Sequence, residues 1–153
     1  MQVSTNHSAA RRSRLGFTLV ELAVVVVIIG VLAAFGVPRF LQAVERSKAS
    51  EAFAYLSAVR TAQERYHARE GTYSSDIASL DIQAPTPKYF SVGTIAASAA
   101  GTSLEDSWTL TLTRSGSSAG YGEYLVIFTD QGFDVTNSTI PDDINPVSTG
   151  TSS

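Results

Sequence analysis

The 153-residue sequence contains no cysteine, so neither a disulfide framework nor a cysteine metal site can form. Histidine is scarce as well, and His67 is the only one beyond residue 16. A Ser-His-Asp triad would have to use it, and we interpret it instead as a solvated residue on a helix face. The sequence also lacks a glycine-rich phosphate loop. It therefore offers no catalytic residues, and we expect a protein that is not an enzyme.

Acidic residues are absent from Met1–Gly16, which carries three arginines. Without this segment the chain has eight Lys and Arg against fourteen Asp and Glu, a net charge of −6. The arginines fit a targeting segment whose positive end stays in the cytoplasm. A remainder this acidic gives no sign of a nucleic-acid patch, and we expect no nucleic-acid partner.

Charge is almost missing from Phe17–Val37, where Glu21 is the only charged residue. As a helix these residues would extend about 32 Å, enough to cross the hydrocarbon core of a bilayer. In hydrocarbon only a helix or a closed barrel satisfies the backbone, which favours a helix. A carboxylate there costs roughly 3 kcal/mol, so Glu21 should have a function and a partner.

The sequence around Gly16 resembles a known processing signal. Gly16 precedes Phe17-Thr18-Leu19-Val20-Glu21, with arginines before it and an apolar run after it, as in the class III signal of type IV pilins and pseudopilins. The likeness continues through Ile28-Ile29-Gly30, Leu32-Ala33-Ala34 and Pro38. The resemblance implies that a prepilin peptidase removes the leader, residues 1–16, by cutting between Gly16 and Phe17. It also implies N-methylation of Phe17 and contact between Glu21 and the amino group of a neighbouring subunit's Phe17.

Physical chemistry supports this assembly role for Phe17 and Glu21. Cleavage after Gly16 would create an α-ammonium on Phe17, the nearest cation at the depth of Glu21. Two charges in hydrocarbon must be well paired to offset their desolvation. We hypothesise that their pairing sets the register of the polymer, as buried polar residues do in coiled coils. Gly30 and Pro38 weaken the helix, and the segment between them is expected either to unwind in the filament or to kink.

Beyond Pro38 the pattern becomes amphipathic. The expected apolar stripe, broken only by a lysine, is Leu41, Val44, Lys48, Ala52, Tyr55, Val59, Ala62 and Tyr66. Gly71 is expected to end the helix as its C′ residue. One helix should therefore run from Phe17 to Glu70, with a transmembrane or filament-core part over residues 17–40 and an amphipathic continuation over residues 41–71.

Residues 72–153 are expected to form a globular head. Short strands are predicted at Tyr89–Ile95, Trp108–Thr113, Tyr124–Phe128 and Gly132–Val135, with Trp108, Leu110 and Leu112 in the core. Ser138–Ser153 is rich in Ser, Thr and Pro and is interpreted as a surface loop or flexible tail. The predicted class is α+β and pilin-like: a long helix, with a protruding apolar half and a packed amphipathic half, against three or four antiparallel strands.

The resemblance implies a structural subunit, of the major-pilin kind, that polymerises into a type IV pilus. Its partners would be further copies of itself, the prepilin peptidase and methyltransferase, an inner-membrane assembly platform and, before assembly, lipid. The precursor would be a single-pass inner-membrane protein with its head outside the cytoplasm, and the product an extracellular pilus or periplasmic pseudopilus. A major pseudopilin of type II secretion and a minor tip or adhesion pilin stay open as alternatives.

No cofactor or metal is expected. Asp130 with Asp134, or Asp142 with Asp143, could supply oxygen ligands to calcium, as the resemblance to cysteine-free pseudopilins allows. Because no EF-hand spacing is present, we interpret these residues as turn acids.

Overall fold

The structure, a computed structural model, describes residues 16–99, 103–116 and 120–148. Most of the predicted leader, residues 1–15, lies outside the described residues. The chain divides into two compact units, Met1–Val37 and Pro38–Ser153. The secondary structure within them consists of one long helix, a short 3-10 helix and four strands. This confirms the predicted α+β class.

Helix α1 runs over Leu19–Glu70, 52 residues, and so matches the predicted helix to within two residues at its start. Pro38 lies inside it. At its end Gly71 has φ 73°, and the Gly71 N–H donates to the carbonyl of His67 at 2.9 Å. This left-handed C′ glycine satisfies a free helix carbonyl, as the sequence indicated.

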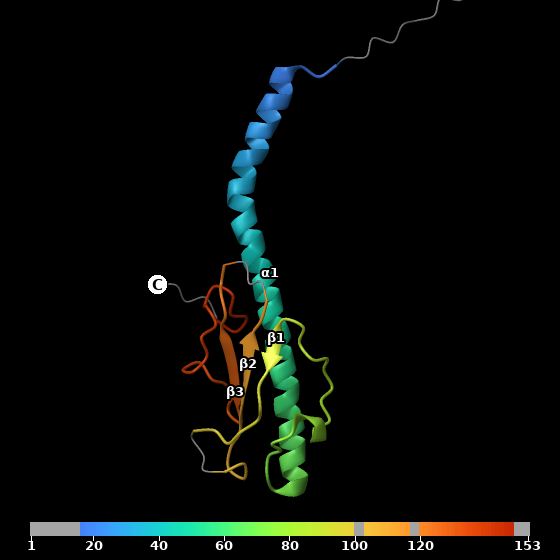
Figure 1. Cartoon of the computed structure of the whole chain (residues 1–153), viewed down its shortest axis with the longest axis vertical. Helices are drawn as coiled ribbons and strands as arrows, with labels where there is room; N and C mark the ends of the chain where they lie inside the picture. The colour runs from blue at the N-terminus through green and yellow to red at the C-terminus, as the bar shows by residue number, and fades with distance from the viewer. Residues whose placement is uncertain (1–15, 100–102, 117–119, 149–153) are drawn as a thin grey trace, which may run out of the picture. The chain divides into compact units, whose positions relative to one another are not determined.

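Four antiparallel strands form a sheet in the order β1-β2-β3-β4. They are β1 (Phe90–Val92), β2 (Thr109–Arg114), β3 (Leu125–Thr129) and β4 (Gly132–Phe133). Figure 1 shows the first three beside the second half of α1. The pairs Leu110 with Phe128 and Leu112 with Val126 place buried side chains opposite one another on the face turned to the core. Trp108, directly before β2, is fully buried, as predicted.

The buried face of α1 is wider than the predicted stripe. Ala52, Tyr55, Val59 and Ala62 are buried as expected, whereas Val44, Lys48 and Tyr66 are half-buried and Leu41 is exposed. A second row that the prediction omitted is also buried, namely Glu45, Ala49, Phe53, Leu56 and Gln63. Residues three and four positions apart lie on the same helix face, so both rows can be buried together. The second row was not predicted because it contains the polar residues Glu45 and Gln63.

The segment expected to be a loop or flexible tail is packed over its described part, which ends at Ser148. Ile140 and Ile144 are buried at 8% and 0% exposure. The Thr139 hydroxyl accepts the Leu125 N–H at 2.9 Å, and the Ser138 hydroxyl accepts the Ile127 N–H at 3.0 Å. Its Ser and Thr side chains therefore hydrogen-bond the free edge of β3, so that up to Ser148 the segment is a loop packed on the sheet rather than a flexible tail.

Candidate functional site

The predicted assembly residue Glu21 lies in the first turn of α1, where it takes part in a capping box. Its Oε2 accepts hydrogen bonds from the Thr18 N–H at 2.8 Å and the Thr18 hydroxyl at 3.0 Å. In return the Glu21 N–H donates to Thr18 Oγ1 at 3.2 Å. This reciprocal pairing satisfies two free donors at the start of the helix. Within the described residues Thr18 is the only hydrogen-bond partner of this carboxylate.

Every described residue from Gly16 to Val37 is exposed. The large apolar side chains include Phe17 at 85%, Leu19 at 86% and Phe35 at 74% exposure. By length and composition α1 can cross a membrane, a property that an N-terminal signal sequence shares. An apolar surface of this extent needs lipid or another protein to cover it.

The two predicted weak points, Gly30 and Pro38, both lie within the continuous helical range of α1. A side chain at Gly30 would meet nothing within 4 Å. The glycine is therefore not required by packing inside this chain. The hypothesis that the segment unwinds in a filament stays a prediction.

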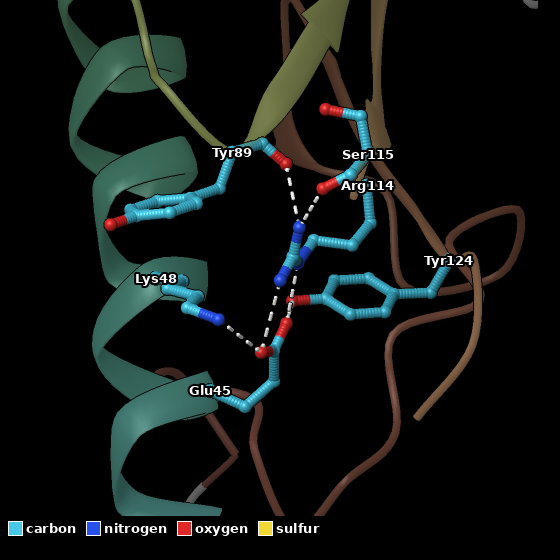
Figure 2. A network of polar contacts seen from close by, with 6 residues as sticks. All are labelled: Glu45, Lys48, Tyr89, Arg114, Ser115 and Tyr124. Carbon is cyan, nitrogen blue, oxygen red and sulfur yellow. Dashed lines mark hydrogen bonds and ion pairs between the residues drawn. The ribbon is translucent and has the colours of Figure 1, made fainter. Parts of the chain in front are cut away.

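A second polar cluster, which the sequence did not indicate, is centred on Glu45 and Arg114 (Figure 2). It lies inside the compact unit Pro38–Ser153, which is called the head from here on. Arg114 donates from Nε to Glu45 Oε1 at 2.5 Å and from Nη2 to Oε2 at 3.1 Å. The Tyr124 hydroxyl donates to Glu45 Oε1 at 3.1 Å, and Lys48 Nζ lies 3.2 Å from Oε2. Glu45 is 0% and Arg114 2% exposed, so this bidentate ion pair joins α1 to β2 in the core.

Arg114 also donates to two backbone carbonyls. Its Nη1 donates to the carbonyl of Tyr89 at 3.1 Å and to the carbonyl of Ser115. The guanidinium lies 5.6 Å from the ring centre of Tyr89, and the Lys48 ammonium lies 5.0 Å from the same ring. A buried ion pair offsets its desolvation only when its other lone pairs and protons have partners, and the contacts with Tyr89, Ser115, Tyr124 and Lys48 supply several of these.

The electrostatics follow from these contacts. Burial alone would raise the pKa of Glu45, but hydrogen bonds from Arg114, Lys48 and Tyr124 and the charge of Arg114 hold that pKa below its ordinary value. The hydrogen bond to Glu45 raises the pKa of Arg114, against the effect of burial. Burial, with the nearby Glu45 carboxylate, raises the pKa of Tyr124. Glu45 and Arg114 are thus held in their charged forms.

Two sequence signals could have indicated this cluster. The alternation of Trp108, Leu110 and Leu112, continued by one step, places Arg114 on the buried face of β2. Counting back from Ala49 and Ala52 by four and seven residues brings Glu45 onto the buried face of α1. Neither signal shows that these two residues pair, because they are 69 positions apart.

The other predicted residues lie apart from both clusters. His67 is half-buried and stacks on Tyr73 with ring centres 4.4 Å apart, and its Nε2 lies 3.2 Å from the carbonyl of Glu105. It is therefore packed between segments rather than fully solvated. Asp134 accepts the N–H groups of Thr136 and Asn137, both at 3.0 Å, as a turn acid does. In the described part of the chain no three His, Asp or Glu side chains gather as a metal site would require.

Comparison with known proteins adds two family matches. Residues 11–37 match the model described as "Prokaryotic N-terminal methylation motif". Residues 38–122, more than half of the chain, match the model described as "Type IV minor pilin ComP, DNA uptake sequence receptor". The first match covers Gly16, Phe17 and Glu21. The second covers the start of the head, both members of the ion pair and the first two strands.

Three curated relatives agree with these matches. The fimbrial protein EcpC of Eikenella corrodens is 39% identical over 87 residues, 57% of this chain and 56% of that protein. The type IV major pilin protein PilA of Myxococcus xanthus is 49% identical over 59 residues, 39% of this chain and 27% of that protein. The type II secretion system core protein G of Pseudomonas aeruginosa is 35% identical over 77 residues, 50% and 54% of the two chains. The alignments thus span from about a quarter to just over half of these relatives.

The long apolar helix joined to an antiparallel sheet, with a methylation motif at its start, defines a pilin-like protein. The chain belongs to the type IV pilin family. The N-terminal apolar helix is compatible both with membrane anchoring and with a place in a pilus filament.

Proposed function

We propose that this chain is a structural subunit, of the major-pilin kind, that polymerises into a type IV pilus after cleavage between Gly16 and Phe17. The observation that carries the proposal is the exposed apolar segment Phe17–Val37, helical from Leu19, with a single acid in it. Within the described residues Glu21 receives hydrogen bonds from Thr18 but has no cation beside it. The methylated α-ammonium of a neighbouring subunit's Phe17 would supply that charge in the filament.

The same proposal gives the protein two successive locations. The precursor would sit in the inner membrane with its arginine-rich leader in the cytoplasm and its head outside. Lipid would cover the apolar helix there until the assembly platform moves the subunit into a filament. In the filament the apolar helices of neighbouring copies would cover one another.

The deciding experiment removes the charge of Glu21 and keeps its shape. We expect Glu21→Gln to give a processed, membrane-inserted monomer that does not enter filaments, as measured by membrane fractionation and electron microscopy of sheared filaments. The matched control is Glu64→Gln, an exposed glutamate on the second half of α1, which should assemble normally. Normal filaments from Glu21→Gln would contradict the proposal. So would mass spectrometry showing assembled subunits that still begin at Met1.

A second candidate within the family is a pseudopilin of type II secretion, which the similarity to core protein G favours. Deletion of the gene distinguishes the two functions. Loss of surface filaments with normal enzyme secretion supports a pilus subunit, whereas loss of secretion with normal filaments supports a pseudopilin.

A third candidate is a minor pilin that binds DNA, which the match to the DNA uptake receptor model favours. Electrostatics weigh against it, because residues 38–153 carry eight Lys and Arg against thirteen Asp and Glu. We therefore expect no shift of a labelled DNA duplex by the purified protein at 50 mM salt. Binding that weakens steeply as salt is raised would favour the DNA-binding candidate instead.

We further propose a purely structural role, without catalysis and without a cofactor. Asp134 satisfies its own turn, and Asp143 accepts the Tyr121 hydroxyl at 2.8 Å. The thermal midpoint of the protein should therefore be the same in calcium and in a calcium chelator. A rise in calcium that Asp143→Asn abolishes would refute this part of the proposal.

A further inference from the structure

A hollow of about 820 Å³ lies over the outward-facing side of β2 and β3. Thr109, Thr111, Ile127 and Thr129 line it, and they alternate along the strands with the buried core residues. The rest of its lining comes from two flanking segments, with Ser98, Ala99, Asp106 and Ser107 in one and Asp130, Gln131, Asp134 and Asn137 in the other. Its volume is within the range of small-molecule sites.

The charges in the hollow decide what it can hold. Its lining contains three aspartates and no Lys or Arg, which disfavours an anionic ligand. The aspartates are also poorly placed to bind a cation. Both carboxylate oxygens of Asp134 accept hydrogen bonds within its own turn, Asp130 Oδ2 accepts one from Gln131, and Asp106 Oδ2 accepts one from Ser103 at 3.4 Å. The hollow therefore suits a neutral ligand.

Several hydroxyl groups in the hollow have unused hydrogen-bonding capacity. Ser107 is only 4% exposed, and its Oγ has no hydrogen-bond partner among the described residues. The hydroxyls of Thr109 and Thr111 also make no hydrogen bond within the described chain. A buried hydroxyl without a partner costs about 1–3 kcal/mol, and such groups in native proteins usually have an explanation. A ligand that presents several hydroxyls would supply partners for Thr109 and Thr111, and for Ser107 once its buried hydroxyl turns into the hollow.

We propose that this hollow binds a short neutral saccharide, with Ser107, Thr109 and Thr111 as its hydrogen-bonding residues. Saccharide hydroxyls both donate and accept, which matches the Ser and Thr groups and the Gln131 amide. Ile127 and Ala99 provide apolar surface for the C–H faces of a sugar ring. The proposal goes beyond filament assembly and does not depend on it, because an unassembled subunit carries the complete hollow.

The test is an NMR titration of the full ¹⁵N-labelled chain in detergent micelles. The probes are chitotriose, maltotriose and mannotriose as neutral saccharides, sialyllactose as an acidic one and trilysine as a basic peptide. We expect at least one neutral trisaccharide to shift the amide signals of β2 and β3 in a saturable way. Sialyllactose and trilysine should shift them less.

The variant Thr111→Val removes one hydroxyl from the hollow and should raise the Kd of the bound trisaccharide about tenfold. Ser107→Ala should raise it as well. The matched control is Thr113→Val, because Thr113 lies on the same face of β2 but does not line the hollow. No saturable shift with any neutral probe, a preference for sialyllactose or trilysine, or equal effects of Thr111→Val and Thr113→Val would each overturn the proposal. Filament formation is scored separately through Glu21→Gln, so a failure here leaves the assembly proposal standing.

Discussion

Glu21 and Glu45 lie on the same helix, but they differ in burial and in the partners of their carboxylates. Glu45 is fully buried in the head and has Arg114, Lys48 and Tyr124 around its carboxylate. Glu21 is exposed in an apolar stretch, and Thr18 is its only hydrogen-bond partner among the described residues. The head supplies the counter-charges of Glu45 from its own residues, whereas the described N-terminal residues supply no counter-charge for Glu21. A self-sufficient head and an incomplete N-terminal helix are what a subunit of a polymer requires.

The largest expected effect comes from removing one member of the buried pair. Glu45→Gln or Arg114→Met should each lower the free energy of unfolding by about 3–5 kcal/mol, because the other charge is left buried and unpaired. The measurement is urea unfolding of the full chain in detergent, followed by the fluorescence of the buried Trp108. Glu21→Gln should change the same quantity by less than about 0.5 kcal/mol.

The double variant Glu45→Leu with Arg114→Met sharpens this prediction. It removes both charges and should lose much less stability than either single variant, since a well-packed apolar pair can replace a buried ion pair. If the double variant loses as much as the sum of the two single changes, Glu45 and Arg114 do not act as a pair. If Glu21→Gln destabilises the head as much as Glu45→Gln does, the contrast between the two glutamates is wrong.

Acid should weaken the head through the same pair. The pKa of Glu45 is lowered in the folded protein, where hydrogen bonds from Arg114, Lys48 and Tyr124 outweigh the opposing effect of burial. Its contribution to stability is therefore complete above the unfolded carboxyl pKa of about 4.3, and is lost as the pH falls through the folded pKa. Thermal midpoints measured between pH 7 and pH 3 should drop more steeply for the wild type than for Glu45→Leu with Arg114→Met. Parallel curves would assign the acid sensitivity to other carboxylates, such as Asp134, whose pKa is also lowered.

The sequence predicted the elements that a single periodicity defines. The helix to Glu70, its glycine end and the buried alternation of Trp108, Leu110 and Leu112 are all confirmed. What it did not predict depends on pairing between distant segments. Arg114 lies one residue beyond the predicted strand Trp108–Thr113, and its partner is 69 residues away. The packing of the tail was not predicted either, because the composition around Ser138 and Thr139 indicates only a surface loop or tail, while their hydroxyls bond to β3.

Glycine gives a second comparison between the two parts of the chain. A Cβ added at Gly93 would lie 2.8 Å from the backbone carbonyl oxygen of Thr111, whereas one at Gly30 would meet nothing within 4 Å. Gly93→Ala should therefore force β1 and β2 apart and cost about 1–3 kcal/mol in urea unfolding. Gly30→Ala should leave the stability of the head unchanged. If Gly93→Ala leaves the free energy of unfolding unchanged, the backbone at the end of β1 can shift to accommodate the added Cβ.

The smallest effect is expected from a local cap. Asp134 Oδ1 accepts the N–H groups of Thr136 and Asn137, and Asp134 Oδ2 accepts the Asn137 side-chain amide at 2.7 Å. Asp134→Ala should therefore lower the free energy of unfolding by about 1 kcal/mol, as the loss of a capping carboxylate does. The control is Asp142→Ala, since Asp142 is exposed and, in the described part of the chain, its backbone carbonyl accepts a hydrogen bond from Ser148 at 2.8 Å but its carboxylate accepts none. The capping box of Thr18 and Glu21 is similar in kind, but Thr18→Ala should not change the urea midpoint of the head, because among the described residues the Thr18 hydroxyl bonds only with Glu21. Equal losses in Asp134→Ala and Asp142→Ala would show that the turn acids act through general charge rather than through their hydrogen bonds.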